Sequence, residues 1–181
     1  MATLPRFDAF ARELVSEREY LSTAYEPDCD YVDGRVEERN LGEFDHAMLQ
    51  GLISNLFLNH RRGWGAHPVP ELRIQVKSMR YRVPDVTVIR SGTPREQILT
   101  RPPLLVIEIL SPEDRRNRVI QRNQDYLDFG IEHVWVIDPG TRTGYRSITG
   151  GLEPVEGGEF TIPGTPIRLR LSELFAEFDS L

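Results

Sequence analysis

The chain has 181 residues, of which 39% are hydrophobic and 28% are charged, and its formal net charge is −6. This length and composition are typical of one globular domain. We therefore expect residues 1–181 to form a single domain, with 1–15 as an N-terminal extension. No apolar stretch approaches the ~20 residues that span a bilayer, and the N-terminus lacks a signal-peptide pattern, so we expect a cytoplasmic protein with no membrane partner.

The first predicted elements are a short helix, a hairpin and a long helix. Ser16 and Glu19 have capping-box spacing, which predicts a helix over 16–21. Asp33-Gly34 is a favoured two-residue turn and predicts a hairpin over 29–39. Apolar residues then recur at helical spacing, which predicts a core-facing helix over 43–60, with apolar positions 48, 49, 52, 53, 56 and 57.

Strands dominate the centre of the chain. An alternating pattern predicts a half-buried strand over 71–77, and two apolar runs predict strands over 83–89 and 104–110. A helix over 114–129 and a strand over 133–137 follow.

The tail is predicted to hold a hairpin around Thr143-Gly144 and a helix over 171–178. This order of elements favours an α/β or α+β domain around a mixed sheet. We expect one sheet to contain four of the central segments, namely 72–76, 83–89, 104–110 and 133–137.

Charge is distributed unevenly along the chain. Residues 1–59 carry a net charge of −7, residues 60–95 carry +6 and residues 96–181 carry −5. The basic segment, which includes Arg80 and Arg82, is either an electrostatic footprint for a polyanion or a set of solvated strand edges and loops. Charge alone does not separate these two interpretations.

Two acidic residues lie in the most strand-like segments, Asp85 within VPDVTVI and Glu108 within LLVIEIL. A buried carboxylate is costly unless it is hydrogen-bonded, paired or bound to a cation. Two carboxylates on adjacent strands could share a hard divalent cation such as Mg²⁺. Alternatively, Asp85 caps its strand and Glu108 forms an internal ion pair with an arginine.

A series of motifs extends from about residue 16 to residue 175, namely SEREYL, YVDGRVEERN, DH, RVPDVTVI, LLVIEILSPEDR, DYLDFGIEHVWVIDP and LSELF. In combination they resemble the Uma-two family of restriction endonucleases, a group within the PD-(D/E)xK nuclease superfamily. The resemblance implies a restriction-endonuclease-like core, a mixed sheet flanked by helices, with an N-terminal hairpin here. It also implies a Mg²⁺ (or Mn²⁺) cofactor, DNA as partner and, by analogy with the superfamily, a homodimer.

Site residues follow from the same resemblance. Asp85 and Glu108 match the acidic motif residues, and Glu38 and His46 match an acidic residue and a histidine around the start of the first core helix. Asp85, Glu108 and Glu38 are thereby implied as metal ligands. His46 is either a satisfied, partly buried histidine or a residue that binds phosphate or orients Glu38.

The chain departs from the family at its lysine. Leu110 stands where the superfamily has lysine, Arg122 where the family often has it, and Arg118 where the family often has aspartate. Arg122 can hold a phosphate but does not readily act as a base. Lys77, the only lysine in the chain, is a candidate by elimination and is otherwise a surface residue.

The sequence therefore predicts a metal-dependent endonuclease that hydrolyses DNA phosphodiester bonds. Two alternatives from other classes remain. One is a catalytically degenerate module that keeps the nuclease fold and binds nucleic acid or protein. The other is a structural interaction protein with no nucleic-acid role, which the acidic net charge favours.

Overall fold

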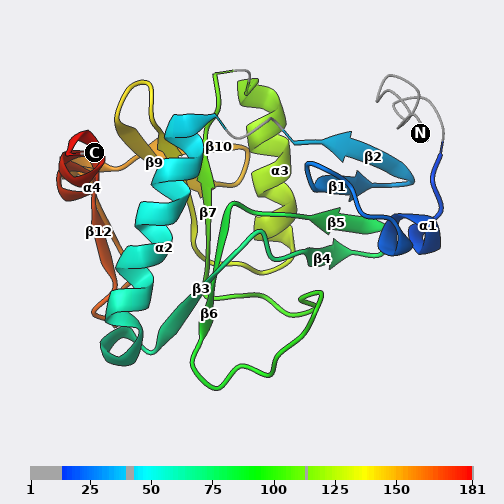
Figure 1. Cartoon of the computed structure of the whole chain (residues 1–181), viewed down its shortest axis with the longest axis horizontal. Coiled ribbons are helices and arrows are strands. Elements are labelled where there is room, and N and C mark those ends of the chain that lie inside the picture. The colour runs from blue at the N-terminus through cyan, green and yellow to red at the C-terminus, as the bar shows by residue number, and fades with distance from the viewer. Residues whose placement is uncertain (1–13, 40–42, 113, 181) are drawn as a thin grey trace, which may run out of the picture.

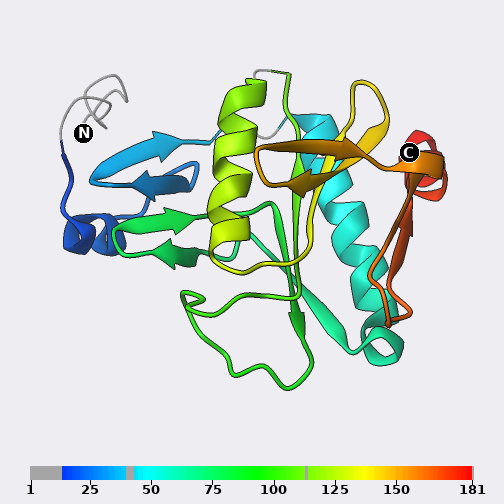
Figure 2. The same cartoon turned by 180° about the vertical axis from the view of Figure 1, so that it is seen from behind.

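The computed structural model describes residues 14–39, 43–112 and 114–180 of the chain. Two β-sheets and a small two-stranded sheet are covered by helices, and the main helices are packed around the larger sheet (Figures 1 and 2). This mixed α/β arrangement confirms the predicted fold class. Most of the predicted N-terminal extension lies outside the described residues.

The larger sheet has six strands in the order β10-β9-β8-β7-β6-β3. β7 and β8 are parallel and every other neighbouring pair is antiparallel, so the sheet is mixed. β7 is buried along its whole length, as its continuous apolar run predicts. The strands are β3 (Ala66–Pro70), β6 (Val86–Arg90), β7 (Leu105–Ile109), β8 (Val134–Asp138), β9 (Thr143–Ile148) and β10 (Gly151–Pro154).

The second sheet has four strands in the order β2-β1-β5-β4. Its strands are β1 (Cys29–Val32), β2 (Arg35–Glu38), β4 (Ile74–Lys77) and β5 (Arg80–Arg82). The predicted hairpin is confirmed, with Asp33 and Gly34 both at positive φ between β1 and β2. The prediction that 72–76 joins the larger sheet is wrong. The alternating pattern predicts which face of β4 is buried, but it does not predict which strand β4 pairs with. That strand is β5 of the smaller sheet.

The two long helices lie on opposite faces of the larger sheet. Alternation along β7 turns Ile107 and Ile109 toward the apolar core under α2 (Phe44–Trp64), and Val106 toward the core under α3 (Arg116–Asp128). Figure 1 shows α2 in front of the sheet and Figure 2 shows α3 in front. Glu108 therefore points to the side of the sheet that α3 covers.

The remaining elements close the two ends of the molecule. Helix α1 (Glu17–Ser22) begins at Ser16, whose Oγ accepts from the Glu19 N–H at 3.2 Å, as the capping box predicts. At the other end are η2 (Glu156–Gly158), β11 (Glu159–Thr161), β12 (Arg168–Arg170) and α4 (Leu171–Asp179).

The tail differs from the prediction at Gly144. This residue lies inside β9 and not in a turn. One hairpin turn, at 139–142, comes before β9, and another, at 149–150, follows it. A Cβ at position 144 would lie 2.5 Å from Cζ of Phe160, so the ring of Phe160 requires glycine there. Close packing, not turn geometry, explains this glycine.

Among the described helices, none combines the length and the apolar character that crossing a membrane would require.

Candidate active site

Asp85 and Glu108 meet where β6 and β7 lie side by side. Val86 is paired with Ile107 in the antiparallel ladder, so Asp85 and Glu108 occupy the next position along the two strands. Their exposed fractions are only 2% and 1%. The predicted proximity of the two acids on adjacent strands is thus borne out by the strand register.

Asp85 is held by groups from three parts of the chain. Its Oδ1 accepts from the Arg39 guanidinium, and its Oδ2 accepts from the Ile109 N–H at 2.7 Å. Nε2 of His46, in the first turn of α2, lies 3.2 Å from the same Oδ2. The side chain of Gln50, one helical turn further on, donates to the Asp85 carbonyl at 2.9 Å. These contacts fix the position of the carboxylate and its backbone.

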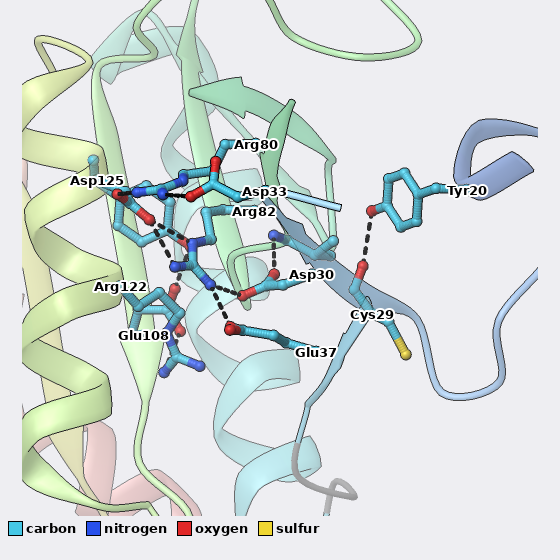
Figure 3. A network of polar contacts seen from close by, with 12 residues as sticks. Tyr20, Cys29, Asp30, Asp33, Glu37, Arg80, Arg82, Glu108, Arg122 and Asp125 are labelled. Carbon is cyan, nitrogen blue, oxygen red and sulfur yellow. Dashed lines mark hydrogen bonds and ion pairs between the residues drawn. The ribbon is translucent and has the colours of Figure 1, made fainter. Parts of the chain in front are cut away.

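Glu108 is held by helix α3. The Tyr126 hydroxyl donates to Oε1 at 2.7 Å, and Nη2 of Arg122 lies 3.1 Å from Oε2. Arg122 and Tyr126 are one helical turn apart, so both side chains reach the same carboxylate from one face of the helix. Figure 3 shows Arg122 directed at Glu108.

The two acids differ in their electrostatics. Burial and the charge of Asp85 raise the pKa of Glu108 to about 7, against the opposing effect of Arg122. Burial also acts to raise the pKa of Asp85, but the His46 hydrogen bond and the Arg39 charge outweigh it and hold that pKa below its usual value. Burial lowers the pKa of His46, but Asp85 outweighs this effect and raises it overall. One acid is therefore firmly ionised, while the other titrates near neutrality.

Not every predicted site residue lies with this pair. His46 and Arg122 do, by the contacts above. Glu38 ends β2 and is exposed, and the neighbouring Arg39 contacts Asp85 instead. Lys77 is exposed at the end of β4, which points away from β6 and β7 in Figure 1. The structure does not bring Lys77 to the two acids, because Lys77 is at the exposed end of β4.

Sequence reasoning missed Arg39, Gln50 and Tyr126 as site residues. Gln50 lies one helical turn after His46 and Tyr126 one turn after Arg122, so helical spacing from two predicted site residues could have found both. Arg39 follows the hairpin and carries no such signal, because its pairing with Asp85 spans 46 residues of sequence.

A network of buried ion pairs lies beside the site (Figure 3). The Arg82 guanidinium donates to Asp30 at 2.8 Å, to Glu37 at 3.1 Å and to Asp125 at 2.6 Å. Arg80 also contacts Asp125, at 2.7 Å. Arg82 is 4% exposed, so the interpretation of solvated strand edges is wrong for this residue. Its charge is compensated inside the chain.

Two cavities flank the carboxylate pair. One, of ≈ 60 Å³, borders Arg39, Arg82 and Arg122, and its other lining residues are Asp30, Glu37, Glu38, Asp114, Arg115, Arg118 and Gln121. The other, of ≈ 330 Å³, lies beyond His46 at the ends of β7 and β8, and its charged lining residues besides His46 are all acids, namely Glu43, Asp45, Asp114 and Asp138. The first cavity thus has the guanidinium groups that an anion requires.

The donor set of the two acids fits a hard divalent cation. An ionised carboxylate offers about four lone-pair positions. Asp85 accepts three of the contacts above and Glu108 accepts two, so both retain acceptor capacity. Within the described residues no group of three or more His, Cys, Asp or Glu side chains is placed to hold a metal. Water and phosphate oxygens, which Mg²⁺ accepts, could supply further ligands.

The family follows from a comparison with known proteins. The model of the Uma2 family, described as "Putative restriction endonuclease", matches residues 17–171. The chain belongs to the Uma2 family. This confirms the resemblance drawn from the motifs, over nearly the same residues.

Two individual proteins are similar to this Uma2 chain. The uncharacterized protein slr1290 of Synechocystis sp. (strain ATCC 27184 / PCC 6803 / Kazusa) is 34% identical over 111 residues, which are 54% of this chain and 58% of that protein. This chain thus spans 58% of the relative's length. A crystal structure described as a putative nuclease belonging to DUF820, from Anabaena variabilis ATCC 29413, has a TM-score of 0.75 and 23% identity. The match covers 88% of this chain and 96% of the crystallised chain, and this likeness establishes the fold.

Proposed function

We propose that this Uma2 protein is a metal-dependent endonuclease that hydrolyses DNA phosphodiester bonds, with Asp85 and Glu108 as the residues that hold Mg²⁺ or Mn²⁺. The observation that carries the proposal is the pair of buried carboxylates at matching positions of β6 and β7, joined there by His46 and Arg122. A bound divalent cation supplies polarisation of the phosphate and acidification of a water molecule.

The side chains around the acids have separate roles in this proposal. Asp85 is kept ionised by Arg39 and His46 and is oriented by the Ile109 N–H, and a cation would have to displace the Arg39 contact. Arg122 remains protonated and stabilises negative charge that develops on the phosphate. Because Arg122 is no base, the attacking water would be acidified by a bound cation and not deprotonated by Arg122, and its proton would pass to solvent.

Access to the acids requires movement of an arginine. Arg39 and Arg122 line the cavity of ≈ 60 Å³, whereas Asp85 and Glu108 lie buried behind them. A phosphate in the cavity would offer either guanidinium a new partner. We infer that substrate and cation enter together, with DNA as the polyanion and a homodimer as the form that cuts both strands.

A specific observation favours the second candidate, a module that retains the fold without catalysis. Each buried acid already contacts an arginine, Asp85 with Arg39 and Glu108 with Arg122. Such pairs satisfy buried carboxylates without any cation.

The test is cleavage of plasmid DNA and of labelled DNA and RNA oligonucleotides with Mg²⁺, with Mn²⁺ and with chelator. We expect cation-dependent cleavage that falls at least about 100-fold in Asp85→Asn, because the variant removes one of two ligand charges. Asp179→Asn is the matched control, since Asp179 forms an exposed ion pair with Arg142. Cleavage that survives both chelator and Asp85→Asn would contradict the proposal. Absence of both cleavage and Mn²⁺ binding would favour the non-catalytic module.

A further inference from the structure

The start of helix α3 carries a row of arginines. Arg115 is the N-cap residue, and Arg118 and Arg122 follow three and seven positions later, on the same helical face. All three line the cavity of ≈ 60 Å³, where Arg39 and Arg82 also lie. Five guanidinium groups therefore border one small cavity.

Two of these arginines pair with no acid among the described residues. Arg39, Arg82 and Arg122 contact the carboxylates described above. Arg115 and Arg118 form no ion pair with any carboxylate in the described parts of the chain. Of the acids that line the cavity, Asp30 and Glu37 bind Arg82.

Two lining acids, Glu38 and Asp114, remain without an arginine within the described residues. Asp114 accepts from the Ser111 N–H at 2.8 Å, so it already has a local role. Glu38 is exposed at the end of β2 and leaves one free negative charge at the cavity. It is the group we expect to oppose an anion there.

The positive charges of the arginines at the start of α3 destabilise this helix. The N-terminus of a helix bears a partial positive charge, which acids stabilise and cations destabilise. The first turn of α3 has no acidic residue, and its N-cap side chain makes no capping hydrogen bond. An anion bound at this end would contact both the N–H groups and the guanidiniums, and would remove the repulsion.

One donor of Arg122 is unused. Nε of Arg122 is buried without an acceptor among the described residues, whereas Nη2 of the same side chain contacts Glu108. Buried donors in native proteins nearly always have a partner. An anion in the cavity could supply this acceptor only after Arg122 turned, because Nε itself is not exposed.

We propose that Arg115, Arg118 and Arg122 form a phosphate-binding row that holds the nucleic-acid strand next to Asp85 and Glu108. The cavity is small, ≈ 60 Å³, which suits a group of the size of phosphate. The identification of the ligand as nucleic acid rests on the proposed function. The row adds a contact with the strand outside the carboxylate pair. Because the contact is to phosphate, it is independent of base sequence.

The experiment measures binding without cleavage. Fluorescein-labelled 20-nucleotide single strands and duplexes are titrated with the full chain in chelator over a range of salt concentrations. The variants are Arg115→Gln, Arg118→Gln and the double variant, and the control is Arg168→Gln. Arg168 is exposed on β12, away from α3 in Figure 1. Strands with a 5′-phosphate and a 5′-hydroxyl are compared, and thermal denaturation verifies that each variant folds.

We expect the double variant to bind about 10-fold more weakly than the wild type, whereas Arg168→Gln changes binding less than twofold. Each lost contact should reduce the slope of log affinity against log salt by about 0.7 for single strands and about 0.9 for duplexes. Glu38→Gln should act in the opposite direction and strengthen binding about twofold. If the double variant loses the same affinity for the 5′-phosphorylated and the 5′-hydroxyl strand, the bound phosphate lies in the strand interior. If it loses affinity only for the 5′-phosphorylated strand, the bound phosphate lies at the strand end.

Two results would overturn the row. One is a double variant with the affinity and salt slope of Arg168→Gln, and the other is a wild-type chain that binds neither strand at low salt. Cleavage by the same proteins with Mn²⁺ keeps the two proposals apart. A loss of binding in the double variant without any wild-type cleavage refutes only the nuclease, and cleavage with unchanged binding refutes only the row.

Discussion

The molecule buries two clusters of charge, and they differ in how completely their groups are bound. Around Arg82, the guanidinium donates from Nε, Nη1 and Nη2 to Asp30, Glu37 and Asp125, and joins the four-stranded sheet to α3. At the candidate site, Asp85 and Glu108 each hold one arginine and keep unused lone pairs. The first cluster is the more fully paired of the two and suits a structural link. The second can accept a new partner, as a ligand site must.

The largest expected effect tests the structural cluster. Arg82→Met should lower the free energy of unfolding by about 3–5 kcal/mol, because it leaves the buried Asp30 without its cation. Urea unfolding measures the change. The control is Arg142→Met, which breaks an exposed pair with Asp179 and should have a much smaller effect. Equal losses in the two variants would show that the Arg82 cluster is not a structural link.

The second prediction tests whether the site can exchange partners. Arg39→Gln should strengthen Mn²⁺ binding by about 2 kcal/mol, a factor of about 30, because it removes a positive charge from Asp85. Titration calorimetry measures the affinity, and Arg73→Gln is the control, since Arg73 pairs with Asp28 away from the site. Weaker Mn²⁺ binding in Arg39→Gln would mean that Arg39 supports the cation site instead of competing with the cation.

A smaller effect follows from the raised pKa of Glu108, about 7. A cation needs the ionised carboxylate, so Mn²⁺ affinity should rise about fivefold from pH 6 to 7 and less than twofold from 7 to 8. The metal-free chain should lose stability as pH rises from about 4.5 to 7, because the folded state binds this proton more tightly than the unfolded state.

Glu108→Gln provides the control for both pH measurements. The variant cannot titrate at this position, so its Mn²⁺ affinity should be lower and nearly flat between pH 6 and 8. An unchanged pH profile in Glu108→Gln would assign the titration to another group, for which His46 is the nearest candidate, since its pKa is also raised.

The smallest expected effect lies outside both clusters. Lys77→Gln should change the cleavage rate by less than about twofold and the free energy of unfolding by less than about 0.5 kcal/mol. The reason is that the side chain is exposed at the end of β4. Cleavage assays and urea unfolding measure both values. A loss of cleavage as large as that of Asp85→Asn would restore Lys77 as the missing lysine.

Local patterns predicted most of the elements but not how they assemble. Capping at Ser16, the turn at Asp33-Gly34 and the apolar run of β7 each act within a few residues, and the structure has all three. The sheet to which β4 belongs is set by pairing with β5, which no local pattern specifies. The strand β3, paired with β6, was missed because its two prolines, at positions 68 and 70, argue against a strand.

The candidate site was predicted in the same uneven way. Asp85 and Glu108 were found because a carboxylate in an apolar strand is costly and therefore conspicuous. Arg39 was missed because arginine is abundant in this chain and its partner is remote in sequence. Arg82 was read as a surface charge for the same reason, although Asp30 and Asp125 enclose it.

The burial of Cys29 has a practical consequence for studying motion in this protein. Cys29 is the only cysteine, it is fully buried in β1, and burial raises the pKa of its thiol to about 11. A thiol reagent therefore reacts only when the buried cluster around Cys29 opens, which β1 and β2 share with Val15, Tyr20 and Tyr81. β2 pairs with β1 and leads directly to Arg39, so the labelling rate of Cys29 reports how often this region next to the site opens. A ligand that binds Arg39 should change the labelling rate of Cys29.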